Sequence, residues 1–268
     1  MTFDDVIAVR ADEAGAYAGA VADGWHTPRG PLGGYVMAIV LEGMRAAVDD
    51  EARMPRSFTV HFLRPPHPGP VTVRPVVERT GRTLTTVTAR LEQDGKLIAL
   101  ALGAFSTPWE SAELTDAPMP DVEPYDPARP PASEIAPGND APPFTRQLTM
   151  KWRFGDPPFS RSDHGLTGGW LGLRESRPVD AAAICVLADA WFPAPWPRLE
   201  RLWAAPTVDL TVHFRAPLPL PDAPLLGRFR SRVVRDGFFD EDGELWTEDG
   251  TLVAQSRQLG LLLPMPGA

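Results

Sequence analysis

The sequence contains nearly the same seven-residue phrase twice. TVHFLRP begins at Thr59 and TVHFRAP at Thr211, so the copies stand 211 − 59 = 152 positions apart. In both copies apolar and polar residues alternate with a period of two, which is typical of a β-strand with one buried face. At this offset the apolar positions coincide, for example Phe58 with Leu210. The chain is therefore expected to fold as two copies of one structural unit.

Further strands are predicted after each repeated phrase. In the first copy, Val71–Thr80 and Leu84–Gln93 are β-rich segments separated by a Gly-Arg break. The pair Asp94–Gly95 then introduces an apolar run, as Asp249–Gly250 does in the second copy. Asp-Gly is favoured in tight hairpin turns because glycine accepts a positive φ. Here the offset is 249 − 94 = 155, which indicates a small insertion between the landmarks.

A helix is expected before the strands in each copy. Gly33–Val48 places its apolar residues on one helical face. Its counterpart, Val179–Phe192, is apolar all round except at Asp180 and Asp189, which predicts a helix covered by sheet on most sides. Each half thus reads as one long helix followed by antiparallel strands.

A proline-rich stretch with little apolar periodicity separates the halves and is interpreted as a linker crossing the surface. The sequence predicts an N-terminal unit at 1–106, this linker at 107–146 and a C-terminal unit at 147–268. A helix wrapped by an antiparallel sheet, written twice, is the plan of the α+β double hotdog fold. We expect the two sheets to join into one continuous sheet, because joining protects edges that each copy alone would expose.

Composition excludes several classes of function. The net charge of −9 argues against nucleic acid as a partner, because phosphate binding needs a basic surface. The chain lacks an apolar run long enough to cross a membrane and begins with acidic residues, so we expect no membrane partner and a cytoplasmic location. Cys185 is the single cysteine and has apolar neighbours, which favours a buried structural thiol. We expect neither a metal nor a cofactor, and a homo-oligomer remains open.

Three polar residues of the second copy, Asp189, Thr207 and Gln258, have no clear counterpart in the first. At the two offsets they face Met37, Pro55 and Gly103, although a short gap would align Asp189 with Glu42. Each has an ordinary structural interpretation: a carboxylate paired with an arginine or at a helix end, a strand-starting threonine and an exposed strand residue. A buried carboxylate without a partner would be costly, however, and helix and sheet face one another in this fold. Their coincidence in one copy favours a functional site.

These residues lie in segments that resemble the acyl-CoA thioesterase II family, whose members are double hotdogs. The family's strand motif Ala-Thr-Ile-Asp-His-Ser-Met-Trp-Phe-His-Arg-Pro resembles PTVDLTVHFRAP from Pro206, and its QDG-LVAS-VQEG resembles EDGTLVAQSRQLG from Glu248. In the first half, LGGY from Leu32 and HFLRPPHPG from His61 are similar to the family's Phe-Gly-Gly-Gln and Phe-Leu-Arg-Pro-Gly-Asp. The resemblance covers most of the chain outside the linker.

The resemblance implies that Asp189, Thr207 and Gln258 hold a nucleophilic water. Two residues depart from the family pattern: Tyr35 stands in place of its glutamine, and Leu210 replaces the histidine after the strand aspartate. These departures affect the expected substrate choice more than the reaction class. The chain is therefore expected to hydrolyse an acyl-CoA substrate.

The residue types suit this chemistry. Asp189 can accept a proton from water, while Thr207 and Gln258 can fix the position of that water. The start of the first helix, Gly33–Gly34–Tyr35, is expected to bind substrate and to stabilise the oxyanion through backbone N–H groups. The structural alternative for the two glycines is a tight turn from loop to helix.

Two other functions remain open. A non-catalytic acyl-CoA or acyl-chain binding protein would keep the fold and lose the water site. An enoyl-CoA hydratase-type hotdog enzyme is the third candidate, because GDPPF from Gly155 faintly resembles the loop of such hydratases, although it lacks their catalytic histidine.

Overall fold

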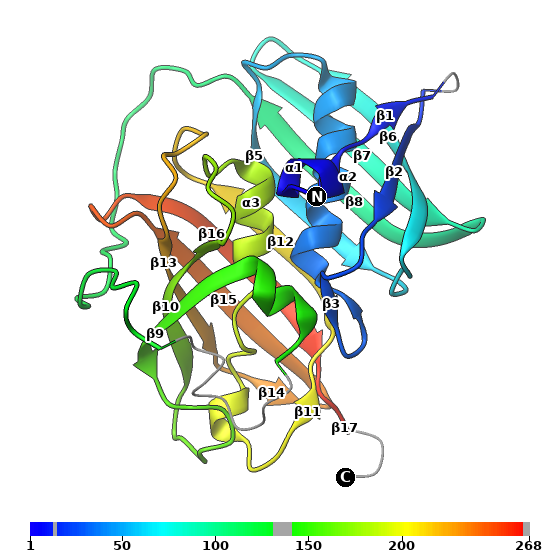
Figure 1. Ribbon diagram of the computed structural model, residues 1–268. Helices are drawn as coiled ribbons and strands as arrows, with labels where there is room; N and C mark the ends of the chain where they lie inside the picture. The colour runs from blue at the N-terminus through cyan, green and yellow to red at the C-terminus, as the bar shows by residue number, and fades with distance from the viewer. Residues whose placement is uncertain (13–14, 131–140, 265–268) are drawn as a thin grey trace.

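The computed structural model describes residues 1–12, 15–130 and 141–264 (Figure 1). Within them, the main element is one antiparallel sheet of 13 strands in the order β1-β2-β6-β7-β8-β5-β12-β16-β15-β13-β10-β9, with β14 paired to β15. Two small sheets, β3-β4 and β11-β17, lie apart from it. The strands of the first half are β1 Arg10–Ala11, β2 Tyr17–Val21, β3 His26–Thr27, β4 Gly30–Pro31, β5 Met54–Phe62, β6 Gly69–Thr80, β7 Leu84–Gln93 and β8 Lys96–Ser106. Those of the second half are β9 Leu148–Gly155, β10 Gly165–Leu173, β11 Trp203–Ala204, β12 Thr207–Phe214, β13 Leu225–Ser231, β14 Val234–Arg235, β15 Phe238–Trp246, β16 Leu252–Leu261 and β17 Leu263–Pro264.

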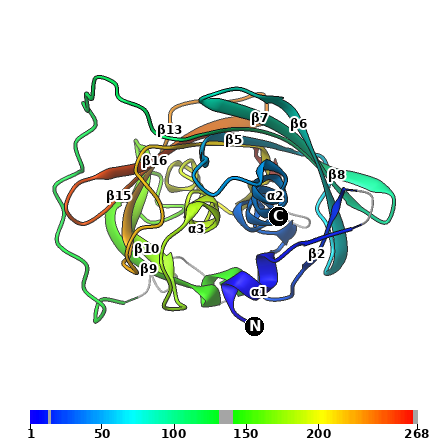
Figure 2. The same cartoon turned by 90° about the horizontal axis from the view of Figure 1, so that it is seen from above.

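The helices lie inside the curve of the sheet, as Figure 2 shows from above. They are α1 Phe3–Ile7, α2 Gly33–Val48 and α3 Ala181–Leu187, together with the short 3₁₀ segments η2 Pro143–Gln147 and η3 Trp196–Arg198. None of these described helices is long and apolar enough to span a bilayer.

The two halves of the sheet are related by an approximate two-fold axis at the repeated phrase. Strand order runs outward from β5 as β8, β7, β6, β2 and from β12 as β16, β15, β13, β10. At the centre β5 and β12 pair antiparallel, with Thr59 opposite Thr211 and a 2.8 Å hydrogen bond between their Oγ1 atoms. The predicted continuous sheet is confirmed, and the repeated phrase forms the seam between the copies.

The first predicted helix is confirmed from end to end, whereas the second is shorter than predicted. Helix α3 begins after Asp180, whose side chain accepts the Ala183 N–H at 2.9 Å, and ends at Leu187. The prediction that it continues to Phe192 is wrong. Pro193 disfavours helical backbone at the residue before it, and Asp189 would place a negative charge at the unfavourable end of the helix dipole.

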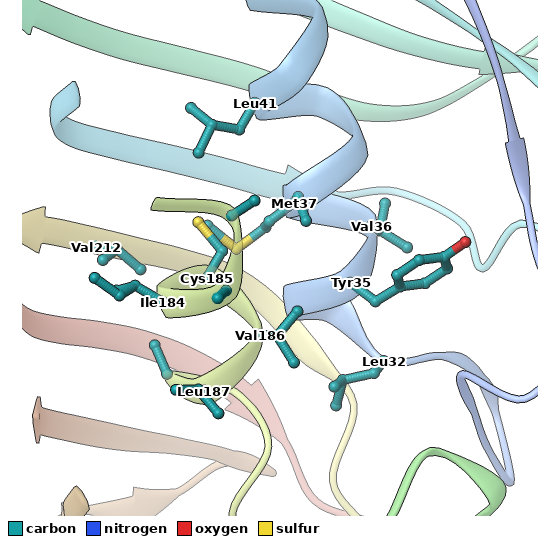
Figure 3. Close-up of a cluster of buried hydrophobic side chains, with 14 of the residues drawn as sticks. Leu32, Tyr35, Val36, Met37, Leu41, Ile184, Cys185, Val186, Leu187 and Val212 are labelled. Atoms are coloured by element: carbon teal, nitrogen blue, oxygen red, sulfur yellow. The ribbon is translucent and has the colours of Figure 1, made fainter. Parts of the chain in front are cut away.

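The core lies between the helices and the inner face of the sheet. Figure 3 shows α2 and α3 in contact through their apolar side chains, with Met37 of one helix beside Cys185 of the other. Cys185 is fully buried, and burial raises the pKa of its thiol well above the ordinary value, as expected for a structural thiol.

The segment between β8 and η2 has neither helix nor strand in its described part and crosses the outer face of the second half-sheet. Two indole N–H groups on that face hold it: Trp170 donates to the carbonyl of Glu123 at 3.0 Å and Trp246 to that of Ala117 at 3.1 Å. Apolar linker side chains complete this second, smaller core: Met119, Val122 and Tyr125.

Candidate active site

Asp189 lies in the turn just beyond α3, where the two halves of the molecule meet. Its Oδ2 atom accepts the backbone N–H of Gly34, in the first turn of α2, at 2.7 Å. The prediction that Asp189 lies within the helix is therefore wrong, because α3 ends at Leu187 and Asp189 is the second residue after it. This shift turns the carboxylate toward the first half of the chain.

Asp189 caps a helix that has no cap of its own. The N-cap residue of α2 is Leu32, whose side chain cannot accept a hydrogen bond. An N-cap acceptor normally bonds the second or third backbone N–H of the helix, and Gly34 is the second residue of α2. The helix dipole also favours a negative charge at this end. A carboxylate from the second half thus satisfies the α2 terminus of the first.

The two glycines at the start of α2 permit this approach. A Cβ atom on Gly34 would lie 2.3 Å from the carbonyl oxygen of Cys185, and one on Gly33 would lie 2.9 Å from Oδ2 of Asp189. Any larger residue at Gly34 would therefore push α3 away. The two glycines therefore allow α2 and α3 to pack closely, and this packing explains why glycine stands at the loop-to-helix turn.

Tyr35 points away from α3, as Figure 3 shows. Its hydroxyl donates to the carbonyl of Val6 and accepts the N–H of Ala22, both at 2.9 Å. Its ring stacks on Trp25 with the centroids 5.0 Å apart. The structure thus brings Gly33 and Gly34 to Asp189 but uses the Tyr35 side chain to anchor the N-terminal segment.

Thr207 reaches the inner face of the sheet because of a β-bulge. Simple alternation puts Thr207 on the same outward side as Asp209 and Thr211, but the pairing of β12 with β16 shifts between Thr207 and Asp209. A bulge adds one residue to a strand and re-aims the side chain before it. The first copy has the same irregularity after Pro55, whose ring offers no hydroxyl.

Gln258 links Thr207 to a residue that the sequence analysis missed. The Thr207 hydroxyl donates to Oε1 of Gln258 at 2.9 Å, and Nε2 of Gln258 donates to Oε1 of Glu241 at 2.7 Å. The second oxygen of Glu241 accepts the N–H of Ala194 at 2.5 Å. Gln258 is buried, so the alternative of an ordinary exposed strand residue is wrong.

Glu241 was detectable from the alternation of its strand. In FFDEDGELW, it shares the inward-facing positions with Phe239, Gly243 and Leu245, so it is an acid among buried positions. Register then places it directly opposite Gln258 on β16. No pattern in one strand could give that partner, which comes from the neighbouring strand.

Two carboxyl groups at this site have raised pKa values. Burial raises the pKa of Asp189 to about 7, although the N–H groups of Gly34 and Gly33 act to lower it. Burial likewise raises the pKa of Glu241 to about 7, against the lowering effect of Ala194 and Gln258. Each group can therefore take up or release a proton near neutral pH.

The site contains hydrogen-bond donors and acceptors that suit a water molecule. Among the described residues, no group of three or more His, Cys, Asp or Glu side chains has the arrangement needed to hold a metal ion. The groups that converge are the Asp189 carboxylate, one hydroxyl, one amide with the Glu241 carboxylate behind it, and the N-terminus of a helix, and together they can bind and polarise a small neutral molecule.

Comparison with known proteins gives family matches in both halves. Residues 21–106 match a model described as the acyl-CoA thioesterase N-terminal domain, and residues 120–262 match the acyl-CoA thioesterase C-terminal domain. No curated protein sequence matches the chain at a significant level.

Similar folds occur among solved structures. A conserved protein of unknown function with a hot dog fold from Alicyclobacillus acidocaldarius is 29% identical, with 98% of each chain covered and a TM-score of 0.83. The acyl-CoA thioesterase II TesB2 of Mycobacterium marinum is 20% identical, with a TM-score of 0.76 over 100% of this chain and 99% of that one. The tesB protein of Mycobacterium avium subs paratuberculosis is 18% identical, with 98% of each chain covered and the same TM-score. The double hotdog prediction is confirmed.

Proposed function

Because the chain belongs to the acyl-CoA thioesterase family, we propose that it hydrolyses an acyl-CoA thioester to a free carboxylic acid and CoA by direct attack of an activated water. The observation that carries this proposal is the meeting of Asp189, Thr207 and the start of α2 at one partly buried point. That point combines a base, a polar clamp and an electropositive helix end.

Asp189 is the proposed general base. Its Oδ2 atom is held by Gly34, which leaves Oδ1 to accept a proton from water. A general base is most effective when its pKa lies near the working pH, and a pKa of about 7 meets that condition. Thr207 orients the same water and Gln258 holds the Thr207 hydroxyl in place, so that the water loses little further freedom on the way to the transition state.

The start of α2 is the proposed site for the oxyanion. The Gly34 N–H bonds Asp189 and the Tyr35 N–H bonds the carbonyl of Leu32. The Gly33 N–H also faces the Asp189 carboxyl, and in our scheme it turns to the oxyanion when substrate binds. The helix dipole adds to this stabilisation. The proposed role of Tyr35 is accordingly limited to holding the backbone of this turn.

The reaction then balances without a cofactor. The water oxygen bonds to the thioester carbon as its proton passes to Asp189, and the carbonyl π electrons move onto oxygen. When the carbonyl re-forms, the C–S bond breaks and its electron pair leaves with the CoA sulfur. Asp189 returns the proton to that thiolate, which completes one turnover.

A panel of acyl-CoA thioesters, assayed with a reagent that reports free thiol, tests the proposal. We expect CoA release by the wild-type protein and a loss of kcat/KM on the order of 10²–10⁴-fold in Asp189→Asn, the range for removing a general base. Asp163→Asn, at an exposed loop position, is the matched control and is expected to match the wild type. Wild-type turnover in Asp189→Asn would contradict the assigned base.

The same panel separates the rival functions. Binding of acyl-CoA without thiol release would support the non-catalytic binding protein. Loss of enoyl absorbance without free thiol would support the hydratase. Either result would overturn the thioesterase proposal.

A further inference from the structure

The hydrolysis scheme gives the Glu241 carboxylate no role, yet this group is buried and hydrogen-bonded beside the proposed site. It is 5% exposed, and both of its oxygens accept hydrogen bonds, one from Gln258 and one from the Ala194 N–H. Burying a carboxylate is costly. An apolar residue would fill the same inward position of β15 at lower cost, so the carboxylate calls for a reason.

Its first effect is on the orientation of an amide. The Glu241 carboxylate can only accept hydrogen bonds, so it fixes which end of the Gln258 amide faces it, namely Nε2. The amide oxygen is thereby turned toward Thr207. Because that oxygen can also only accept, Thr207 must donate its single hydroxyl proton to it.

We propose that Glu241 is a positioning residue which, as a carboxylate, orients the Gln258 amide so that Thr207 accepts a hydrogen bond from the nucleophilic water instead of donating one. The inference rests on the proposed function, because it assigns a role in the same hydrolysis. It extends the site by one residue beyond the trio expected from the sequence.

The polarity of Thr207 matters because a water molecule has two protons and two lone pairs. With Asp189 accepting one proton and the Thr207 Oγ1 atom accepting the other, both lone pairs remain available to attack the thioester carbon. A Thr207 hydroxyl that donated to this water would occupy a lone pair. One that donated to Asp189 would compete with the water for the base, and in either case attack is slowed.

Protonation of Glu241 reverses the direction of the hydrogen bonds from Glu241 through Gln258 to Thr207. One oxygen must still accept the Ala194 N–H, so the proton sits on the other and donates to Gln258. The Gln258 amide must then present its oxygen to Glu241 and its nitrogen to Thr207. Thr207 now accepts from the amide and turns its own proton toward Asp189 or the water, which is the unfavourable arrangement.

Burial and nearby charges raise the pKa of Glu241, so its protonation changes near neutral pH. Burial is the main cause that raises its pKa to about 7, and two acids add to the effect: Asp189 from the turn after α3 and Asp240 on the same strand. Arg257 of the adjacent strand β16 is engaged outside, in ion pairs with Asp240 and Asp242. Glu241 and Asp189 thus titrate together.

Glu241→Gln tests the proposal with nearly unchanged shape. The single oxygen of the new amide accepts the Ala194 N–H, so its nitrogen faces Gln258. The direction of the hydrogen bonds through Gln258 to Thr207 is then reversed at every pH. We expect kcat to fall on the order of 10–100-fold, as for a misaligned nucleophile, with KM little changed. Glu248→Gln, exposed on the loop after β15, is the control and should leave kcat unchanged.

The pH profile gives a readout that a structural role would not move. In the wild type, protonation of Asp189 and of Glu241 each lowers the rate, so log kcat/KM should fall just below pH 7 with a slope clearly steeper than one. In Glu241→Gln only Asp189 titrates, and the slope should be one. Unchanged kcat and an unchanged slope in this variant would overturn the inference.

A double-mutant cycle covers the case in which Glu241→Gln disturbs the fold. If Glu241 acts through Gln258, then adding Glu241→Gln to Gln258→Ala should reduce kcat no further. Losses that multiply would overturn the inference. A wild-type protein that releases no CoA would count against the proposed function instead, so the two failures are distinguishable.

Discussion

At the scale of single residues, Thr207 connects the proposed base to the amide of Gln258. Its hydroxyl donates to Gln258 at 2.9 Å, and its oxygen lies near the Asp189 carboxyl. Valine has the same shape without the hydroxyl, whereas serine keeps the hydroxyl and loses a methyl group. These two substitutions therefore separate hydrogen bonding from packing.

We expect Thr207→Val to lower kcat for acyl-CoA hydrolysis on the order of 10–100-fold, because both the water and Gln258 lose a partner. Thr207→Ser should keep kcat within about threefold of the wild type, because the hydroxyl remains in place. Steady-state kinetics on both variants provides the measurement. Equal losses in the two would assign Thr207 to packing alone.

At the scale of elements, the two helices meet where α2 begins, and Asp189 serves there both as cap and as proposed base. The two roles respond differently to substitution. Asparagine still accepts the Gly34 N–H but is a poor base, whereas alanine does neither. Asp189→Ala should therefore lower the free energy of unfolding by about 1 kcal/mol, the usual loss for an N-cap.

Asp189→Asn should lose activity as completely as Asp189→Ala while unfolding at or above the wild-type midpoint at pH 7, because it keeps the cap without the cost of burying a charge. Thermal unfolding followed by circular dichroism, together with thiol release, gives both quantities for each variant. A melting temperature that falls equally in both would mean that the cap depends on charge rather than on the hydrogen bond.

Gly34→Ala tests the contact between the helices directly. Its Cβ would lie 2.3 Å from the carbonyl oxygen of Cys185 and 2.8 Å from the Cα of Val186, so α3 must move. We expect a loss of about 3 kcal/mol in unfolding free energy, the upper range for an overpacked core. Denaturant unfolding gives the value, with Gly172→Ala in β10 as a comparison, since the nearest atom to that Cβ would lie 3.4 Å away, at ordinary van der Waals distance. A loss of unfolding free energy in Gly34→Ala that is no larger than in the comparison variant would contradict the packing argument.

At the scale of the whole molecule, the repeat could be predicted because its signal is local. Period-2 alternation specifies each strand by itself. The spacing of 155 residues between the two copies, which aligns Gln258 with Gly103, agrees with the pairing of the strands. Leu210 lies opposite Gln258, just as Phe58 lies opposite Gly103. The duplication therefore predicted both the fold and the asymmetry of the candidate site.

The remaining features depend on contacts between segments distant in sequence. Thr207 faces inward because a bulge interrupts the alternation, and Asp189 lies beyond α3 because the helix ends early. Glu241 acquires its role only when β15 and β16 pair in register. In each case the site residue breaks the local pattern that made the rest of the fold predictable.

The two buried acids also make the stability of the whole molecule depend on pH. Asp189 and Glu241 have ordinary pKa values of 3.8 and 4.5, and both rise to about 7 in the folded protein. The folded state therefore holds their protons more tightly than the unfolded state does. Their stabilising contribution is complete below about pH 4 and is lost as the pH rises through about 7.

Asp189→Asn/Glu241→Gln, combined in one protein, isolates this effect, because carboxyl groups with lowered pKa values, such as Asp5 and Asp249, are common to both proteins. The melting temperature of the double variant minus that of the wild type should increase as the pH rises from about 4 to 7. Above about pH 8 both acids are ionised in the folded and unfolded states, and the difference should stay constant. Differential scanning calorimetry across this range gives the measurement. A difference that does not change with pH would mean that the two acids titrate normally, and the proposed tuning of the site would fail with them.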